Sequence, residues 1–351
     1  MLSSRYNFLC KVLLLCIALQ LVSIIKGNAQ VSEPTKTFRF FWDDDYFNDL
    51  GQGTDKAYTS GLQLAIFYNK NHPSRFFIDK WLPKAGDSCI NTFGTGVMQI
   101  MYTPQYLKPA YYYPGDYSYA GGIVARHSLY SFNPKNKCDI QTEIIAGVMG
   151  PAAFAGSAQL MLHKILADTG IPGGWKNQYN NDILFNVNCA YEKQLYSNDK
   201  WIEFIGDANA SIGTMFDAAE TGVIIRMGKM EPYFNGFLKH YYVNRANGHK
   251  VQLYFTINPA LQVVAYSAFL QGGLFSSLPT VNEFVHSGNT TAEIFFTQPA
   301  KSIENIVGNI SYGPTIAYKS CSFSFIQTYS TRVLKGVYPY IYGNITFCYS
   351  W

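Results

Sequence analysis

The sequence predicts an all-β protein, a twelve-stranded antiparallel transmembrane β-barrel with one short helix in an external loop. Three observations lead to this fold class: few charged residues, many aromatic residues, and segments in which apolar and polar residues alternate. Only 14% of the residues are charged, whereas 16% are aromatic, including 27 Tyr and 25 Phe. A barrel in a bilayer needs this balance, because its outer wall is apolar and aromatic side chains gather at both membrane interfaces.

Residues 1–29 have the pattern of a signal peptide. Arg5 and Lys11 provide a positive start, an apolar run follows at 12–25, and small residues of the kind found at cleavage sites end the segment. A membrane anchor is the alternative, but the run is short and contains polar residues. We therefore expect residues 30–351 to form the barrel domain, which carries the active site on its external rim.

The predicted exported chain has almost no net charge. The whole sequence carries 27 basic and 23 acidic side chains, and cleavage would remove Arg5, Lys11 and Lys26 but no acid. The basic balance is therefore mostly a property of the predicted export signal and gives no reason to expect nucleic acid as a partner.

The cysteines imply no disulfide framework. Five remain outside the predicted signal peptide, an odd number with no C-x-x-C pair and no zinc-ligand spacing. A bridge between Cys89 and Cys138 is compatible with export and stays open at this point.

Alternation at period two is clearest in the last segment, 341–351, where apolar or aromatic residues alternate with mostly polar ones. Similar alternation runs through 185–192, 201–207 and 251–258. A soluble β-sandwich would alternate too. Here, however, the polar face is rich in Asn, Gln, Ser and Thr rather than Lys and Glu, which suits a wet lumen. The terminal Trp351 is also typical of outer-membrane barrels, in which the last aromatic residue is read by the barrel-assembly machinery.

Twelve segments are predicted to be strands, at residues 37–43, 57–69, 92–103, 119–132, 139–149, 183–195, 201–214, 220–230, 250–268, 303–319, 321–332 and 340–351. An even count brings both chain ends to the periplasmic side. If the first strand runs outward, the external connections are residues 44–56, 104–118, 150–182, 215–219, 269–302 and 333–339. The opposite turns at 133–138, 196–200 and near 320 are short, as expected, whereas 70–91 and 231–249 are longer than periplasmic turns usually are.

The first external connection is strongly acidic. It begins with the adjacent carboxylates Asp43–Asp45, and Asp55 follows ten residues later. Like charges this close repel one another unless a cation or hydrogen-bond donors hold them, so the segment is either a solvated loop or a cation site. Alternation along the strands places the first and third of these carboxylates and Thr59 on the inner face of the barrel, and Ser60 toward lipid.

A short helix is predicted in the third external connection. Pro151 suits a first helical turn, and the Ala, Leu and Met content favours helix as far as about Asp168. On this helix Gln159 and His163 share one face at the spacing i, i+4. A single helical His is usually structural, but the strand count places this one at the same end of the barrel as the acidic connection.

Several motifs occur in an order and spacing that resemble a known family. They are Asp43-Asp44-Asp45-x-Phe47 to Asp55-x-x-Tyr58-Thr59-x-Gly61, Tyr102-Thr103-Pro104, Asp116-x-x-Tyr119-Ala120-Gly121, Gly150-Pro151 to Gln159-x-x-x-His163, Gly174-Trp175-x-x-Gln178 and Tyr191-Glu192-Lys193. Together they resemble the outer-membrane lipid A 3'-O-deacylases, twelve-stranded barrels that remove an ester-linked acyl chain from lipopolysaccharide. The resemblance covers about residues 36–195 by motif and the remainder by strand pattern only.

The resemblance implies a carboxylic ester hydrolase in which His163 activates water. The implied catalytic residues are His163, Gln159, Asp45 and Thr59. The implied ligands of a Ca²⁺ ion are Asp43, Asp44, Asp45 and Asp55. The implied substrate contacts are Tyr58, Asp116, Tyr119, Trp175 and Gln178. Lipid A in the outer membrane of a Gram-negative bacterium is the implied substrate, with the site facing the exterior.

Two departures from the family pattern concern substrate recognition. The family usually has Glu-Asn-Asp where this chain has Asp43–Asp45, and many members have Asp-Arg-Pro where it has Asp116, Tyr117 and Ser118. The missing Arg puts in doubt any contact with a substrate phosphate, so head-group specificity is the property most open to change. Two alternatives remain: an enzyme acting on another acyl lipid such as a phospholipid, and a non-catalytic, porin-like barrel. A serine acyl-enzyme has no support, because the chain lacks a G-x-S-x-G motif.

Overall fold

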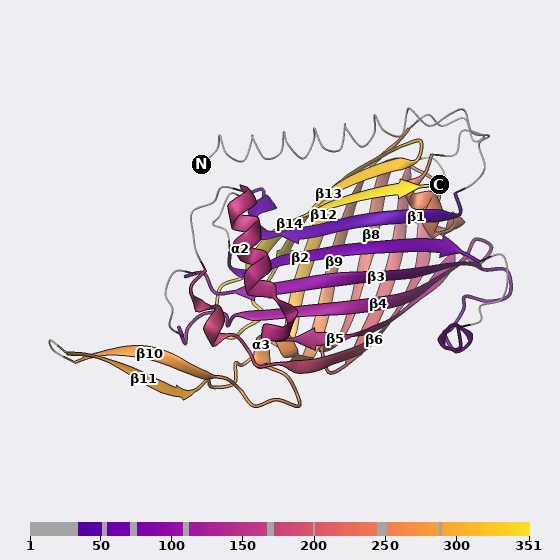
Figure 1. Ribbon diagram of the computed structural model, residues 1–351. Coiled ribbons are helices and arrows are strands. Elements are labelled where there is room, and N and C mark those ends of the chain that lie inside the picture. Colours follow the sequence, from indigo (N-terminus) through magenta and orange to yellow (C-terminus); the bar gives the residue numbers. More distant parts are fainter. Residues whose placement is uncertain are drawn as a thin grey trace.

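The computed structural model describes residues 34–50, 55–70, 76–107, 112–166, 172–198, 201–243, 251–287 and 290–351. The predicted signal peptide, residues 1–29, lies outside the described residues. Within the described ranges, twelve antiparallel strands close a barrel in the order β1-β14-β13-β12-β9-β8-β7-β6-β5-β4-β3-β2 (Figure 1). These strands are β1 (Lys36–Asp44), β2 (Ala57–Asn69), β3 (Ile90–Thr103), β4 (Ala120–Asn133), β5 (Cys138–Met149), β6 (Asp182–Ser197), β7 (Ile202–Gly213), β8 (Phe216–Lys229), β9 (Gln252–Ser267), β12 (Ile306–Tyr318), β13 (Cys321–Ser330) and β14 (Tyr340–Ser350).

The predicted fold class is confirmed. All twelve predicted strands are present, with ends that differ from the predicted ones by about four residues or fewer. The first and last strands pair along their length, for example Phe40 with Phe347, so the barrel has no open edge. None of the helices in the described part of the chain has the length and apolar content needed to cross a bilayer.

Side chains alternate between the two faces of the wall as the sequence predicts. In β2, Leu64 and Ile66 are 42% and 43% exposed on the outside, whereas Ala65 and Phe67 are buried inside. The lumen contains ion pairs such as Arg126 with Glu143, whose closest atoms are 2.7 Å apart. The polar lumen predicted from the alternation is therefore present.

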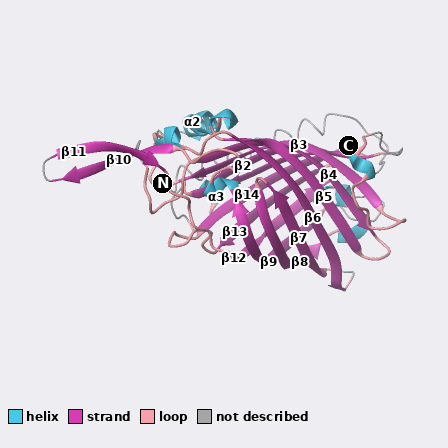
Figure 2. Cartoon of the chain, turned by 90° about the horizontal axis from the view of Figure 1, so that it is seen from below, coloured by secondary structure: helices cyan, strands magenta, loops and turns pink. Residues whose placement is uncertain are grey.

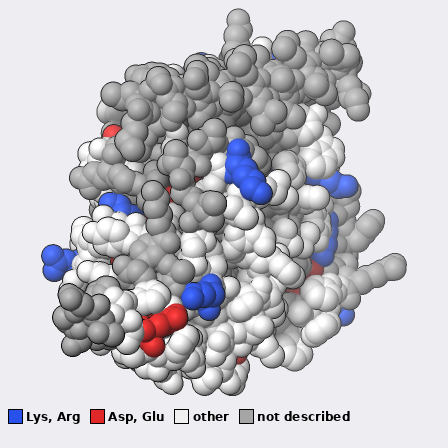
Figure 3. All heavy atoms as spheres, turned by 60° about the vertical axis from the view of Figure 1, so that its left-hand side comes forward, with Lys and Arg blue, Asp and Glu red and all other residues white. Residues whose placement is uncertain are grey.

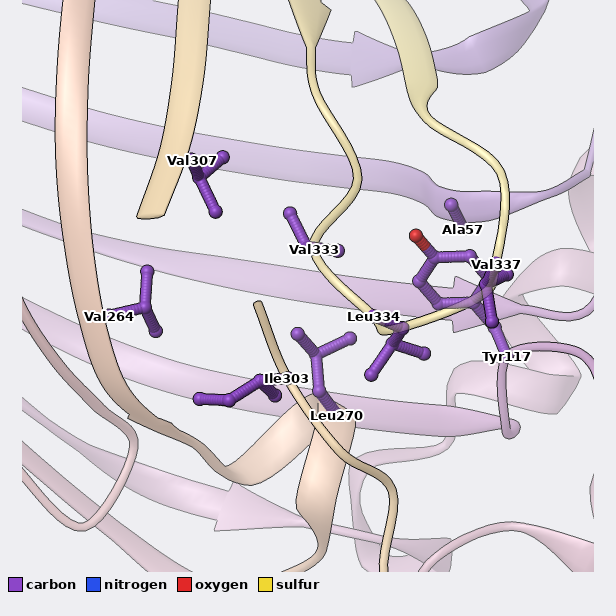
Figure 4. Packing of buried hydrophobic residues seen from close by; sticks show 9 residues of the cluster. All are labelled: Ala57, Tyr117, Val264, Leu270, Ile303, Val307, Val333, Leu334 and Val337. Carbon is purple, nitrogen blue, oxygen red and sulfur yellow. The ribbon is translucent and has the colours of Figure 1, made fainter. Parts of the chain in front are cut away.

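Both ends of the lumen are filled by apolar side chains. At one end, η5 (Tyr233–Asn235) and η6 (Phe237–Tyr241) insert Phe237 and Leu238 against the inner wall. At the other end, a cluster that includes Tyr117, Leu270 and Leu334 packs between loops and strands (Figure 4). A porin needs an aqueous channel, so this packing disfavours the porin-like alternative.

The end of the barrel closed by the Leu334 cluster carries the additional elements. The predicted helix is present as η3 (Pro151–Ala153) followed by α2 (Ala155–Leu166), with Phe154 between them at φ +56°. Figures 1 and 2 show α2 at the same end as a projecting hairpin of β10 (Thr280–Ser287) and β11 (Thr290–Thr297). This hairpin and the short helix α3 (Ala268–Gln271) lie in the external connection predicted at 269–302, in addition to the predicted strands and helix.

The five described cysteines are free thiols, and Cys89 and Cys138 are among them. The bridge between these two, left open by the sequence, is not formed.

Candidate active site

Helix α2 lies against the outer side of the barrel wall, over β3 and β4 (Figure 1). Small residues allow this close approach: a Cβ on Gly121 would lie 2.3 Å from the Cβ of Ala155. On the helix itself, a Cβ on Gly156 would lie 2.8 Å from the ring of Trp175. As a result, the face with Gln159 and His163 is turned toward the wall, and these side chains are only 2% and 9% exposed.

A pocket of about 30 Å³ lies between α2 and the wall, large enough for about one water molecule. It is lined by Asp44, Asp45, Tyr46, Asp55, Thr59, Ser60, Met101, Gln159, Leu162 and His163. The strand count is therefore right in bringing the acidic connection and the helical His to one end of the barrel. The pocket lies on the outer side of the wall, however, whereas the alternation along the strands predicted the lumen side.

Asp55 is the centre of the hydrogen bonds in this pocket. Its Oδ1 accepts a hydrogen bond from Gln159 Nε2 at 2.8 Å and lies 3.2 Å from His163 Nε2. Gln159 is held in turn by Trp175, whose Nε1 donates to Gln159 Oε1 at 2.7 Å. Asp55 has a left-handed backbone (φ +61°), a conformation that is uncommon outside glycine and is concentrated at functional sites.

The other two carboxylates of the pocket are held by the chain around them. Asp44 accepts hydrogen bonds from Tyr46 N at 2.9 Å and Trp42 Nε1 at 3.1 Å, and Asp45 accepts one from Lys56 N at 2.7 Å. Burial, and then repulsion from Asp44 and Asp55, raise the pKa of Asp45 well above its usual range. Without a positive partner, the pocket therefore favours the neutral, protonated form of this carboxyl group, and a nearby cation would favour its charged form.

A β-bulge in β2 explains why simple alternation placed Thr59 on the wrong face. The register with β3 shifts between Tyr58 and Ser60, which leaves Thr59 as the extra residue. Thr59 Oγ1 then meets Thr103 Oγ1 at 2.5 Å and lines the pocket. Ser60 faces outward as predicted, but on that side it borders the pocket.

The protein-family model described as Outer membrane protein LpxR matches residues 12–351. The chain belongs to the LpxR family. Among solved structures, it is similar to LpxR from Salmonella typhimurium, with a TM-score of 0.67 and 17% identity over 90% of this chain and 100% of that chain.

Two other barrels are less similar. The β domain of the Bordetella autotransporter BrkA has a TM-score of 0.42 and 11% identity, over 91% of this chain and 100% of that chain. The Pseudomonas putida toluene transporter TodX has a TM-score of 0.35 and 10% identity, over 90% of this chain and 89% of that chain. No curated protein matched the chain by sequence.

Two residues predicted for the site of this LpxR-family protein face the lumen instead. Asp43 accepts hydrogen bonds there from Tyr58 Oη at 2.8 Å and Asn344 Nδ2 at 2.9 Å. Neither Asp43 nor Tyr58 lines the pocket, because successive residues of a strand point to opposite faces of the wall. Asp43 is therefore not placed as a ligand beside Asp44 and Asp45, nor Tyr58 as a substrate contact there.

Three further predicted residues do not line the pocket. Asp116 holds the neighbouring loop, since its carboxylate accepts hydrogen bonds from Gln105 N, Tyr117 N and Tyr338 Oη at 2.6–2.8 Å. Tyr119 supports Trp175, with ring centroids 5.0 Å apart. Gln178 lines a second groove, on the other side of Trp175.

Sequence reasoning missed four side chains of the pocket, those of Tyr46, Ser60, Met101 and Leu162, and assigned a different role to Asp55. Met101 and Leu162 form apolar lining, and Tyr46 follows the acidic run. Their signal was available in part, because Leu162 precedes His163 on the predicted helix. The contact between Asp55 and His163 had no sequence signal, since the two are 108 positions apart.

The carboxylates suit a hard cation such as Ca²⁺ in chemistry, since all offer oxygen ligands. Asp44 and Asp45 both line the pocket, and a cation there would offset the repulsion between them. Across the described residues, however, no group of three or more His, Cys, Asp or Glu side chains is arranged to hold a metal ion.

Proposed function

We propose that this LpxR-family chain is a lipid A deacylase that hydrolyses the 3'-O-linked acyl ester of lipid A. The observation that carries the proposal is the placement of His163 and Gln159 over a carboxylate-lined pocket on the outer wall of the barrel. A lipid in the surrounding leaflet can reach such a pocket sideways, without entering the lumen. A lumen site would require the acyl chain to leave the bilayer.

His163 is proposed as the general base. An Asp55 carboxylate that accepts the Nε2–H of His163 fixes the tautomer, so the other ring nitrogen is the basic one. That nitrogen takes a proton from water, and the resulting hydroxide attacks the ester carbonyl carbon. The tetrahedral intermediate then breaks the bond to the sugar oxygen, which takes the proton from His163 and leaves as the alcohol, while the acyl chain leaves as a carboxylic acid.

Gln159 and Trp175 are positioning residues in this scheme. Their hydrogen bonds to each other and to Asp55 hold the carboxylate under the imidazole. Thr59 and Ser60 border the same pocket and offer hydroxyl donors for the oxyanion. Ca²⁺, with Asp44 and Asp45 as its proposed ligands, would supply positive charge for the developing oxyanion.

Recognition of the head group is proposed to differ from that of many family members. Tyr117, which stands where they have Arg, is 2% exposed and packs on Tyr338 with ring centroids 5.4 Å apart. Exposed cations are present along α2 instead: Lys164 and Lys176 each line a groove there. Figure 3 turns this end of the barrel toward the viewer and shows isolated basic side chains on a largely uncharged surface. We assign substrate phosphate to these two lysines.

The site is proposed to face the exterior of an outer membrane. The connection with α2 and the connection with β10 and β11 leave the same end of the barrel, and outer-membrane barrels carry their long connections outside. The predicted signal peptide at residues 1–29 would direct export, and the barrel-assembly machinery would insert the chain.

Mass spectrometry of lipid A from cells with and without the gene tests the proposal. Loss of one 3'-linked chain only when the gene is present is the expected result. Released fatty acid with unchanged lipid A would indicate a phospholipid substrate, and unchanged lipids of both kinds would indicate a barrel without catalytic activity.

A further inference from the structure

In the connection between β2 and β3, residues 76–85 fold back over the outer side of the barrel wall, at the end opposite α2. We call residues 76–85 the wall flap; it contains the 3-10 turn η2 (Ile78–Lys80). At its end, Ala85 N donates to Ser131 Oγ at 3.0 Å, and Asn133 Nδ2 donates to Ala85 O at 2.7 Å. This long connection has no part in the site described above.

A buried carboxylate fastens the wall flap to the wall. Asp79 Oδ1 lies 2.6 Å from His127 Nε2 of β4, and Asp79 Oδ2 lies 2.6 Å from Lys70 Nζ. The Asp79 side chain is 1% exposed, so the flap shields this cluster. A shielded carboxylate with two nitrogen partners is a costly arrangement to break, because removing a partner leaves a buried charge.

The flap lies on the membrane-facing side of the wall. His127 and Leu129 share the alternation of Ile123, which is 39% exposed on the outer face of β4. Leu82 of the flap packs on Leu129, which has no exposed surface. The flap therefore covers wall that would otherwise touch lipid.

The exposed surface of the flap is aromatic. Phe76, Phe77 and Trp81 are 44%, 62% and 83% exposed. These fractions are similar to that of Ile183, 65% exposed on the membrane-facing wall of β6. Lys80 and Lys84 are exposed beside them. Exposed aromatic side chains next to lysines are typical of protein segments at a membrane interface.

We propose that the wall flap, fastened by Asp79, inserts Phe77 and Trp81 into the phospholipid leaflet at this end of the barrel. Lys80 and Lys84 then reach the phosphate head groups. Phospholipid is the partner that suits this surface. The flap continues a wall that already faces lipid, and the flap itself carries cations at its rim. In the orientation proposed above, this is the periplasmic leaflet.

The depth of Trp81 tests the proposal. The full-length protein is reconstituted into phosphatidylcholine vesicles with brominated or ordinary acyl chains, and the emission of Trp81 is taken as the difference between wild type and Trp81→Phe. Folding of both proteins is checked by the heat-dependent shift of the barrel on a gel. The expected difference spectrum is blue-shifted, loses most of its intensity in brominated lipid, and is insensitive to aqueous iodide.

Two variants test the fastening. Asp79→Asn is expected to weaken the quenching of Trp81 by brominated lipid, whereas Asp87→Asn, which changes an exposed acid in the same connection, leaves the quenching unchanged. The proposal is overturned if Trp81 emits as in water and is quenched by iodide only. It is equally overturned if neither quencher reaches Trp81, which would indicate contact with a second copy, or if Asp79→Asn behaves like Asp87→Asn.

Discussion

Asp55 and His163 are 108 positions apart in the sequence, yet Asp55 Oδ1 and His163 Nε2 lie 3.2 Å apart in the pocket under α2. The same carboxylate oxygen accepts a hydrogen bond from the side-chain amide of Gln159. A carboxylate that meets a catalytic imidazole in this way orients the ring and stabilises its protonated form.

Replacing Asp55 by Asn keeps the size of the side chain but removes the charge and can reverse the tautomer of His163. We expect kcat to fall by roughly 100- to 1000-fold with little change in KM. Asp49→Asn is the matched control, because Asp49 bonds Tyr312 Oη at 2.7 Å and does not line the pocket. Deacylation assays on the purified variants test this prediction. Wild-type activity in Asp55→Asn would contradict the proposal that Asp55 orients His163.

His163→Ala removes the proposed base. We expect deacylation to be lost while the barrel still shows its heat-dependent gel shift, since His163 is on a helix outside the barrel strands. Ser157→Ala, on the exposed side of the same helix, should keep activity. If His163→Ala still removes an acyl chain from lipid A, His163 is not the base.

Trp175→Phe keeps an aromatic ring but loses the N–H that holds Gln159 Oε1 at 2.7 Å. A hydrogen bond of this kind is worth about 1 kcal/mol, so we expect kcat to fall by roughly tenfold or less. Trp201→Phe, at the opposite end of the barrel, is the control. A change in KM alone would show that Trp175 binds substrate instead of positioning Gln159.

Gly121→Ala should push α2 away from the wall, because the new Cβ would lie 2.3 Å from the Cβ of Ala155. Overpacking of this kind costs about 1–3 kcal/mol, and here it would displace the helix that carries the proposed base. We expect activity to fall, and the double variant Gly121→Ala with Ala155→Gly to recover it. Failure of the double variant to recover activity in a folded barrel would place the effect elsewhere.

Chelation tests the proposed cation. The pocket gathers three carboxylates, so EGTA should silence the enzyme and added Ca²⁺ should restore it. Mg²⁺ should restore it poorly, because it prefers a tighter octahedral shell with several waters. Direct Ca²⁺ binding, measured on wild type and on the double variant Asp44→Asn with Asp45→Asn, gives a readout independent of turnover. Full activity in chelator would remove the cation from the mechanism.

The strands, their order and the end of the barrel at which the candidate pocket lies could be predicted from the sequence. Alternation is a local property, because each strand must present apolar residues to lipid every second position, as Leu64 and Ile66 do. Because the number of strands is even, the first strand begins and the last strand ends at the same end of the barrel, and this determines which connections lie at the other end. The helical spacing of Gln159 and His163 is equally local, and α2 confirmed it.

The sequence alone also gave the family resemblance, which the match over residues 12–351 confirmed. The sequence alone did not show on which side of the barrel wall the pocket lies. The bulge between Tyr58 and Ser60 inserts one residue into the alternation, so counting from Gln63 placed Thr59 in the lumen. Nothing local marks that extra residue.

Only the tertiary structure decided that the candidate pocket lies outside the barrel and that Asp55 contacts His163. The position of α2 depends on contacts between distant segments, above all the close approach of Gly121 and Ala155 and the packing of Trp175. Such contacts exist only once the wall has closed and the loop has folded back on it. Periodicity fixes where each side chain points along its own strand or helix, whereas the face against which a loop packs is set by complementary surfaces far apart in the chain.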